Sequence, residues 1–385
     1  MYQSLLLLLA SLVAMSVLHA AEWTITANAN PSIQYDDNVL MEEDKQDSFH
    51  FAIRPTTVMG HALENSASSI SVGYKIDRYM SLSELDTENP FIQAQTQHQT
   101  ERSEWGLSAS YVEDSTRTDA ADDTGDFTTQ SIVTTKSIAP SYSYQLTERD
   151  SLSVNGSYSE RNYSTTDYDD NETKSLTTAW QHQYTERLSG GLSAAVYNYQ
   201  ADGPTRTSEN DNYNLSLTVN YQWTEEWQVD GRIGVRHLKS EDTDSARNKE
   251  KNTNTGSAFD FSLKKQGEID SLTIGANRTL SPSSTGEVDE QLGVNINWSR
   301  NLSETLTASI RASYQETTSA LDDSNEKREN INFSPSLRWQ FERNVGLDFS
   351  YNYRQQNESD QDDVDSNAVM LTLTYDWDEG LRASR

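Results

Sequence analysis

The chain has 385 residues, a formal net charge of −30 and no cysteine, and only 34% of its residues are hydrophobic. A soluble domain of this size needs a larger apolar share to bury one core, so the composition argues against an ordinary soluble globular protein. Disorder is disfavoured as well, because 19 Tyr, 8 Trp and 9 Phe recur periodically. The remaining class is a fold that keeps polar residues in an unusual interior.

Residues 1–20 have the pattern of a signal peptide. A short apolar stretch from Leu5 to Leu18 is followed by His19-Ala20, a small-residue cleavage site. The stretch is too short and wrongly flanked for a membrane-spanning helix. The absence of cysteine excludes a lipoprotein anchor and fits an exported protein that does not rely on disulfides. We expect a signal peptide at 1–20, an outer-membrane β-barrel at 21–377 and a short C-terminal tail at 378–385.

From Trp23 to Tyr35 the residues alternate between apolar and polar, which predicts a strand with one apolar and one wet face. Similar alternating runs follow at Phe49–Ile53, Ile70–Ile76, Trp105–Tyr111, Tyr213–Trp223, Leu292–Trp298, Ile331–Trp339 and Leu371–Trp377. All such runs together give about 18 strands, each near the roughly 9 to 11 residues that a tilted strand needs to cross a bilayer.

The connections between these strands alternate between short turns and long loops. The short turns recur at about 38 to 41 residues and share a sequence, as in Thr147-Glu148-Arg149 and Thr185-Glu186-Arg187. The long connections are rich in Asp, Asn, Ser, Thr and Gly: Glu113–Gln130, Arg161–Thr173, Glu241–Thr253 and Arg354–Ser366. Such alternation is typical of outer-membrane barrels, with short periplasmic turns and long extracellular loops. The sequence therefore predicts an all-β fold, a single transmembrane antiparallel up-and-down β-barrel.

Aromatic residues gather near both ends of the predicted strands. Those near the short turns are Trp23, Trp105, Tyr144, Tyr184, Trp223, Trp227, Trp298, Trp339 and Trp377. Those near the loops are Tyr35, Tyr74, Tyr111, Tyr158, Tyr213, Tyr314 and Tyr351. Two aromatic girdles around an apolar band are typical of a membrane barrel and not of a soluble sandwich. Lys136, Arg278 and Glu290 have the parity of the lipid face, but they lie near the loop ends, above this band.

The same parity predicts which side chains line the lumen. The basic side chains expected to point inward are His50, Arg54, Lys75, Arg232, Arg236, Lys264, Arg311 and Arg338. Asp230, Asp260 and Asp348 have the same parity. A net basic wall inside an acidic protein would attract an anionic solute. The alternative is that these residues pair across the lumen, as Asp260 with Lys264, and only hold the barrel in shape.

The acidic loops carry no pattern of a binding site. None of their clusters has the spacing and glycine of a calcium loop, so we interpret them as solvated segments kept soluble by charge. The alternative is that they bind divalent cations, or bridge through cations to lipopolysaccharide phosphates. The mature histidines are scattered without a nearby serine or carboxylate pattern. We therefore expect neither an enzyme nor a cofactor or metal site. No loop is long or apolar enough to fold into the lumen as in trimeric porins, so we expect a monomer.

Two segments, Ile33–Val39 with Tyr35-Asp36-Asp37-Asn38 and Pro140–Arg149 with its Thr-Glu-Arg turn, resemble the β-barrel porin 2 family. These outer-membrane proteins are associated with exopolysaccharide gene clusters. The resemblance implies an 18-stranded barrel through which a secreted polysaccharide crosses the outer membrane, together with periplasmic polysaccharide export components. The alternation from Val369 to Trp377 resembles the signal that the barrel-assembly machinery reads, although Asp378–Arg385 follow it.

We therefore expect a passive outer-membrane conduit for an exopolysaccharide, with a preference for an anionic polymer. Outer-membrane lipid, lipopolysaccharide and the secreted polysaccharide are the expected partners, and no nucleic acid is expected. One alternative is a general or solute-specific diffusion porin. The other is an adhesin or structural barrel whose loops carry the function.

Overall fold

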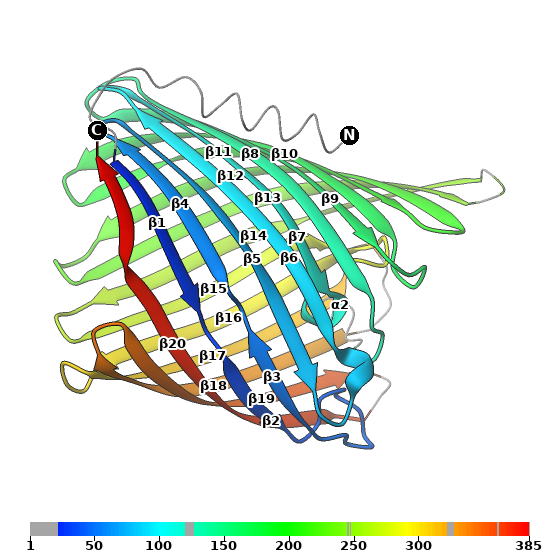
Figure 1. Ribbon diagram of the computed structural model, residues 1–385. Helices are drawn as coiled ribbons and strands as arrows, with labels where there is room; N and C mark the ends of the chain where they lie inside the picture. The colour runs from blue at the N-terminus through cyan, green and yellow to red at the C-terminus, as the bar shows by residue number, and fades with distance from the viewer. Residues whose placement is uncertain are drawn as a thin grey trace.

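The computed structural model describes residues 22–119, 127–244, 246, 248–321, 327–359 and 362–384, and its description of side chains ends at Tyr375. These residues form a closed barrel made almost entirely of antiparallel strands (Figure 1). The predicted signal peptide at 1–20 lies outside the described residues. Within the described ranges, no helix is both long enough and apolar enough to cross a membrane.

The sheet contains 20 strands, which make 18 crossings of the barrel wall. In chain order they are β1 Glu22–Ala29, β2 Ser32–Asp36, β3 Ser48–Ile53, β4 Thr56–Leu63, β5 Ser66–Tyr79, β6 Thr87–Gln99, β7 Ser103–Ser115, β8 Ile132–Gln145, β9 Asp150–Tyr163, β10 Asp170–Thr185, β11 Leu188–Asp202, β12 Arg206–Gln222, β13 Trp227–Asp244, β14 Lys249–Gln266, β15 Asp270–Pro282, β16 Val288–Asn301, β17 Leu306–Ser319, β18 Lys327–Glu342, β19 Val345–Glu358 and β20 Val364–Ser384. Two short helices, η1 (Ser83–Leu85) and α2 (Thr116–Asp119), lie in the loops.

The difference between strands and crossings comes from two prolines. Pro31 separates β1 from β2, and Pro55 separates β3 from β4. Proline has no N–H for the strand ladder, so each strand breaks there and then continues in the same direction. The predicted number of about 18 membrane-crossing strands is therefore confirmed.

The barrel closes where the last strand meets the first. β20 pairs antiparallel with β1, from Glu22↔Ser384 to Ala29↔Tyr375, and with β2. Closure leaves no exposed edge in the membrane. The expected tail at 378–385 is instead strand as far as Ser384. The prediction was wrong because residues 22–25 offer an open strand edge, which residues 381–384 fill.

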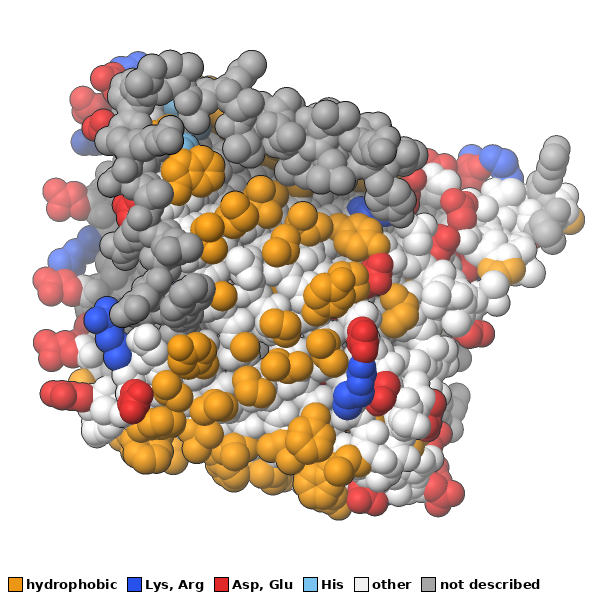
Figure 2. Space-filling model, viewed as in Figure 1, with side chains coloured by type: hydrophobic (Ala, Val, Ile, Leu, Met, Phe, Trp, Pro, Cys, Tyr) orange, Lys and Arg blue, Asp and Glu red, His pale blue; other side chains and the backbone are white. Residues whose placement is uncertain are grey.

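The outer surface carries the apolar residues that the alternation predicted. Large hydrophobic side chains stand exposed on it, including Val72, Leu176, Leu215, Leu217, Ile233, Val235, Phe261 and Phe349. On the face drawn in Figure 2, apolar side chains form a band between two charged zones. In water such a continuous patch would be unfavourable, whereas a bilayer buries it. The low hydrophobic content is thus explained, because only one face of each strand needs to be apolar.

Both aromatic girdles are present on this surface. Trp23, Trp105, Tyr184, Trp223 and Trp339 are exposed near the short turns, and Tyr35, Tyr74 and Tyr213 are exposed near the loops. The side chain of Trp377 lies outside the described part. Amphipathic rings at these two levels mark the two membrane interfaces.

The recurring threonine of the short turns has a structural reason. The hydroxyl oxygen of Thr147 accepts hydrogen bonds from the backbone N–H groups of Arg149 (3.2 Å) and Asp150 (3.0 Å). Thr224 does the same for Trp227, at 3.1 Å. The side chain thereby satisfies backbone donors that the tight turn leaves free. The predicted hairpin turns are confirmed.

The strands are longer than a bilayer requires. β13 and β14 have 18 residues each, and they pair out to Thr243↔Lys249, so the segment Glu241–Thr253, expected as a loop, is mostly a protruding hairpin. Cross-strand ion pairs stabilise its outer end, because the Glu241 carboxylate bonds Lys249 and Lys251. Two polar strands can continue beyond the lipid as long as their backbones still form hydrogen bonds with each other.

Asp36 of the Tyr35–Asn38 segment holds the closing strands together at the loop end. Its buried carboxylate accepts hydrogen bonds from the Ser366 hydroxyl of β20 (2.6 Å) and from the Arg354 guanidinium of β19 (2.8 Å). It also accepts one from the backbone N–H of Asn38 (3.0 Å). A buried carboxylate with this set of donors ties the first strand to the last two.

The next two residues continue the same junction. Asp37 accepts hydrogen bonds from the backbone N–H (2.7 Å) and the side-chain amide (3.0 Å) of Asn367. Asn38 is fully buried and donates to the carbonyl oxygens of Glu42 (2.8 Å) and Asp365 (2.9 Å). The segment that carries the family resemblance therefore closes the barrel and folds the loop that follows it.

Replacement of Asp36 by alanine is expected to lower the free energy of unfolding by about 2 to 4 kcal/mol, because it leaves the half-buried Arg354 without its carboxylate. Urea unfolding of the barrel in lipid vesicles measures this loss. The matched control is Glu43→Ala, at an exposed position in the same loop. Equal unfolding midpoints for the two variants would contradict the role given to Asp36.

Candidate functional site: the barrel lumen and its mouth

The inner wall is lined mainly by neutral polar side chains. On β12, for example, the residues that alternate with the lipid-facing ones are Asn210, Asn212, Asn214, Ser216, Thr218, Asn220 and Gln222. Amide and hydroxyl groups both donate and accept hydrogen bonds. A wall of this kind suits a hydrophilic solute that carries many hydroxyl groups.

Strand parity places all eight predicted basic residues on the inner side, opposite the exposed apolar ones. Five of them have a carboxylate partner: His50 with Asp77 (2.8 Å), Lys75 with Asp114 (2.9 Å), Lys264 with Asp230 (2.9 Å), Arg338 with Asp348 (3.3 Å), and Arg236 with Glu290. These five residues therefore form ion pairs within the barrel, as expected if they only hold it in shape.

The predicted partner of Lys264 was wrong. Its ammonium bonds Asp230 on the neighbouring β13 and not Asp260 on its own strand. Four residues along a strand are about 13 Å apart, which is farther than a lysine reaches to bond an aspartate. The neighbouring strand, in contrast, brings Asp230 close, because Lys264 is opposite Gln228.

Arg54, Arg232 and Arg311 differ from the others. All three are exposed to solvent, and within the described part of the chain none forms an ion pair. The Arg54 guanidinium lies 4.8 Å from the centre of the buried Phe91 ring, a cation–π contact that holds the arginine in place. Their positive charges remain available to a passing anion.

One side of the outer mouth is covered by two loops. Arg117 of α2, in the β7–β8 loop, donates hydrogen bonds to the carbonyl oxygens of Phe127 (2.7 Å) and Val39 (2.6 Å). Phe127 packs on Met41 of the β2–β3 loop, and the inward Arg354 of β19 lies over its ring at 5.5 Å. Since these contacts run from β7 to β19, the β7–β8 loop reaches across part of the mouth.

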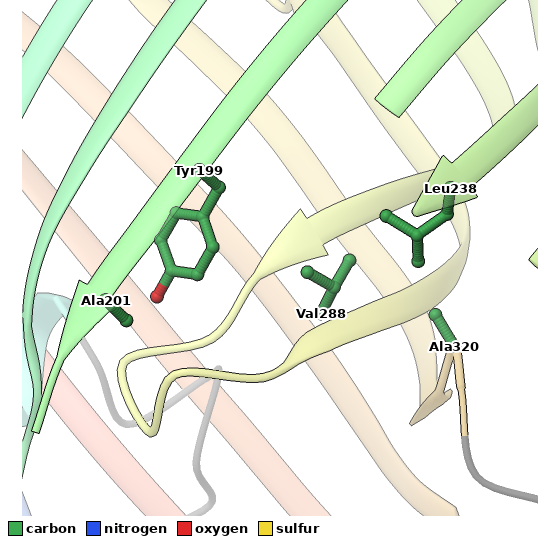
Figure 3. Packing of buried hydrophobic residues seen from close by; sticks show 5 residues of the cluster. All are labelled: Tyr199, Ala201, Leu238, Val288 and Ala320. Atoms are coloured by element: carbon green, nitrogen blue, oxygen red, sulfur yellow. The ribbon is translucent and has the colours of Figure 1, made fainter. Parts of the chain in front are cut away.

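The other side of the mouth holds the end of the β15–β16 hairpin. Its Val288 packs in a buried cluster with Tyr199 and Ala201 of β11 and Leu238 of β13 (Figure 3). The Tyr199 hydroxyl donates to the carbonyl oxygen of Ser283 at 2.5 Å. Because Tyr199, Ala201 and Leu238 point inward, the hairpin end lies on the inner side of the wall and narrows the path.

This finding corrects the expectation that no loop folds inward. The sequence signal is the apolar Leu280 and Val288, which follow the lipid-face parity but lie beyond the charged Arg278 and Glu290. An apolar side chain beyond the lipid-facing band would be exposed to water unless other protein groups pack around it. Gly286, with φ of +82°, provides the tight turn between them.

The inward bend of the β15–β16 hairpin shortens the pairing between β14 and β15. β14 pairs with β15 only from Phe259↔Arg278 to Gln266↔Ser271, although β14 pairs with β13 out to Lys249. Beyond Arg278 the two strands diverge. Side chains span the divergence, because the Glu290 carboxylate bonds both the inward Arg236 and the outward Arg278.

Asp169, in the β9–β10 loop, is a titratable residue that contacts the end of this hairpin. Its backbone N–H donates to Ser284, and a side chain at Gly286 would place its Cβ 2.6 Å from the carboxylate. Burial raises the pKa of this carboxyl, Arg206 opposes the shift, and Asp170 and Asp202 add to it. A raised pKa in the docked state means that protonation favours docking, and that docking weakens as the pH rises through this pKa.

We expect single-channel conductance to be lower at about pH 4 than at pH 7, since the usual aspartate pKa is about 3.9. Asp169→Asn replaces the carboxyl group by an amide that stays uncharged, so it should reduce this pH dependence. Asp44→Asn in the exposed β2–β3 loop is the control and should keep it. A pH response that is the same in both variants would exclude Asp169 as its source.

No group of three or more His, Asp and Glu side chains within the described ranges has the geometry of a metal site. Among the described residues, the inner wall offers a solute hydrogen-bonding groups and three guanidinium groups that form no ion pair.

Comparison with solved structures shows the same fold at low identity. OccAB4 of Acinetobacter baumannii is similar with a TM-score of 0.50 and 9% identity, over 93% of this chain and 99% of that one. OccK1 (OpdK) of Pseudomonas aeruginosa has a TM-score of 0.49 and 11% identity, over 94% and 100% of the two chains. No curated protein sequence matches.

Two family models match parts of the chain. Residues 120–248 match the one described as "Putative MetA-pathway of phenol degradation". Residues 273–376, from β15 to β20, match the one described as "Putative beta-barrel porin 2". The predicted resemblance is thus confirmed over this part, and the chain has the β-barrel fold of bacterial outer-membrane porins.

Proposed function

We propose that the barrel is a passive conduit for carbohydrate, with an anionic exopolysaccharide as the exported cargo. The observation that carries this proposal is the inner wall of amide and hydroxyl groups with its three unpaired arginines. Amides and hydroxyls exchange hydrogen bonds with sugar hydroxyls at little cost in desolvation. A guanidinium pairs with the carboxylate of an acidic sugar in a bidentate geometry. The family resemblance supports export as the direction, and the fold supports a channel without enzymatic activity.

A second candidate is a solute-specific diffusion porin. It is favoured by the mouth, which the β7–β8 loop and the β15–β16 hairpin cover from two sides. A small solute passes such a mouth more easily than a polymer does. If the cargo is a polymer, the end of the β15–β16 hairpin has to move out of the lumen before the polymer can pass.

A deletion strain distinguishes these two functions. If the barrel exports the polymer, loss of the gene abolishes the surface polysaccharide while polymer collects in the periplasm, and uptake of small acidic sugars is unchanged. If it is a diffusion porin, the strain displays its polymer normally and takes up the solute more slowly. Complementation with the wild-type gene, which should restore the lost phenotype, is the control.

A further inference from the structure

One edge of β14 lacks a partner strand over the part nearest the loops. Residues 259–266 pair with β15, whereas residues 249–258 pair only with β13, and no other strand of the described chain joins them. The backbone N–H of Gln266 donates toward β13, to Glu226, and that of Gly267 donates toward β15, to Asp270 (2.8 Å each). Backbone groups of successive residues thus alternate between the two neighbours. The N–H and C=O groups left on the open edge are those of Lys249, Lys251, Thr253, Thr255 and Ser257.

The open edge has the composition of a strand that accepts a partner. An edge that stays unpaired in water is usually protected by lysine, proline or a bulge. Charged residues protect only the tip, residues 249–251, whereas residues 252–258 contain neither a charge nor a proline. Thr253, Thr255 and Ser257 are exposed on this edge, and threonine favours strands. The open edge therefore calls for a strand that pairs with it.

The register between β14 and β15 identifies that strand. If the pairing at Phe259↔Arg278 continued along both strands, Ser284 would be opposite Thr253. In the structure Ser284 lies elsewhere, because its carbonyl oxygen accepts a hydrogen bond from the backbone N–H of Asp169 in the β9–β10 loop (2.9 Å). This position is beside β11, so that β12 and β13 lie between Ser284 and β14. The missing partner of the open edge is therefore the end of β15, which bends into the lumen.

The end of β17 bends inward together with the β15–β16 hairpin. Asp289 pairs with Ser319, and the backbone N–H of Ala320 donates to the carbonyl oxygen of Val288 (3.0 Å). Ala320 is also part of the buried cluster in Figure 3. We call residues 280–290 and 318–321 the inward flap. Because β15, β16 and β17 stay paired with one another in it, the flap is one piece of sheet, and only the seam between β14 and β15 is open.

Arg236 lies at the point where this seam opens. Its guanidinium covers Gly256 of β14, where a Cβ would be 2.9 Å from the Nη2 atom, and it bonds Glu290 of the inward flap. Only 2% of the Arg236 side chain is exposed, and its Nε atom has no hydrogen-bond partner among the described residues. A buried donor without a partner costs free energy. The inward position of the flap is therefore stabilised by apolar packing and one ion pair, and it is opposed by this unsatisfied group.

We propose that the inward flap has a second position, in which β15 pairs with the open edge of β14 and closes the seam. The movement exchanges the packing of Val288 against Leu238 for backbone hydrogen bonds along β14. Pro282 would be opposite Thr255, and because proline has no N–H, it limits the number of these bonds and lets the strands separate again. The mouth is narrowed in the observed position and open in the second one.

The second position also changes the charge of the lumen. Glu290 has the outward parity of β16, whereas Arg236 has the inward parity of β13, so a closed wall separates them and breaks their bond. Glu290 keeps its bond to Arg278, which has the outward parity as well. Arg236 then joins the three lumen arginines that form no ion pair. The flap thus couples opening of the mouth to a stronger preference for anions, whatever solute the barrel carries.

A disulfide can trap the second position. Thr253→Cys with Ser284→Cys joins two residues that would be directly opposite each other, at a Cα distance of about 5.5 Å that a disulfide can span. In the observed position they are too far apart to react, because β12 and β13 lie between them. The matched control is Lys249→Cys with Ser284→Cys. Lys249 lies on the same edge, but it is about 13 Å farther along the strand and thus out of register.

Oxidation of the barrel in lipid vesicles should join the Thr253 and Ser284 positions at least about tenfold faster than the control pair. In planar bilayers the cross-linked channel should conduct about twofold more current, with a ratio of anion to cation permeability raised about twofold, and reduction should reverse both changes. Arg236→Gln in the cross-linked channel should cancel the gain in permeability ratio and keep the gain in conductance. Equal cross-linking rates of the two pairs, a conductance that cross-linking leaves unchanged, or a permeability gain that survives Arg236→Gln would each overturn the proposal.

Discussion

Removal of the inward end of the β15–β16 hairpin is expected to raise single-channel conductance by about twofold or more, because it frees part of the mouth. Ser281 and Asp289 are directly opposite each other in the sheet, so residues 282–288 can be replaced by the two-residue turn Asn-Gly without a change of register. The variant loses Val288 and with it the contact to Leu238 and Tyr199. Planar-bilayer recordings measure the conductance.

The protruding β13–β14 hairpin offers a matched control. Thr243 is opposite Lys249, so an Asn-Gly turn in place of residues 244–248 shortens a hairpin of the same rim without opening the mouth. This variant should conduct like the wild type. If both deletions have the same effect, the inward position of the β15–β16 hairpin does not limit the current.

A disulfide tests the same contact in the opposite direction. The chain has no cysteine, so Ala201→Cys with Gly286→Cys introduces a single pair. A Cβ at Gly286 would lie 3.4 Å from the Cβ of Ala201, close to the range of disulfides. Oxidation should hold the conductance low, and reduction should raise it. The pH dependence is not the readout here, because the new Cβ at Gly286 would lie 2.6 Å from the Asp169 carboxylate and displace it.

Replacement of Arg54, Arg232 and Arg311 by glutamine is expected to lower the ratio of anion to cation permeability by about threefold or more. None of these guanidinium groups forms an ion pair among the described residues, although Asp260 is directly opposite Arg232 in the sheet, so their loss removes positive charge from the inner wall. The reversal potential in a salt gradient measures the ratio. The lumen of the variant should become cation-selective.

The control removes an ion pair and keeps the net charge. Lys264→Gln with Asp230→Asn deletes the 2.9 Å pair of β13 and β14, and the selectivity should stay close to that of the wild type. If the three arginines and this pair contribute equally, the charge of the lumen acts only through its sum and not through unpaired groups.

The sequence alone predicted the barrel, because one period-2 pattern determines both faces of a membrane strand. It also predicted the girdles, since lipid selects the same residue types at each level. The breaks at Pro31 and Pro55 and the pairing of residues 381–384 with β1 were missed. These features depend on neighbouring strands and not on local periodicity.

The sequence predicted which side chains point into the lumen but not which ion pairs they form. Parity gives the face on which Lys264 lies, whereas its bond to Asp230 follows from the register between β13 and β14. The inward hairpin was missed for a similar reason. Leu280 and Val288 have the parity of the lipid face, and only their packing with Leu238 of another hairpin shows that they lie above the lipid. Long-range packing of this kind leaves no period in the sequence.

Block of the ionic current by oligosaccharides in a planar bilayer tests the proposed conduit most directly. Fragments of an acidic polysaccharide, neutral fragments of the same length and a small carboxylate are compared on the purified barrel whose β15–β16 hairpin has been shortened. The account predicts reversible block by the acidic fragments at the lowest concentration, and weaker block when Arg54, Arg232 and Arg311 are glutamine. An open channel whose current none of the oligosaccharides interrupts would contradict it.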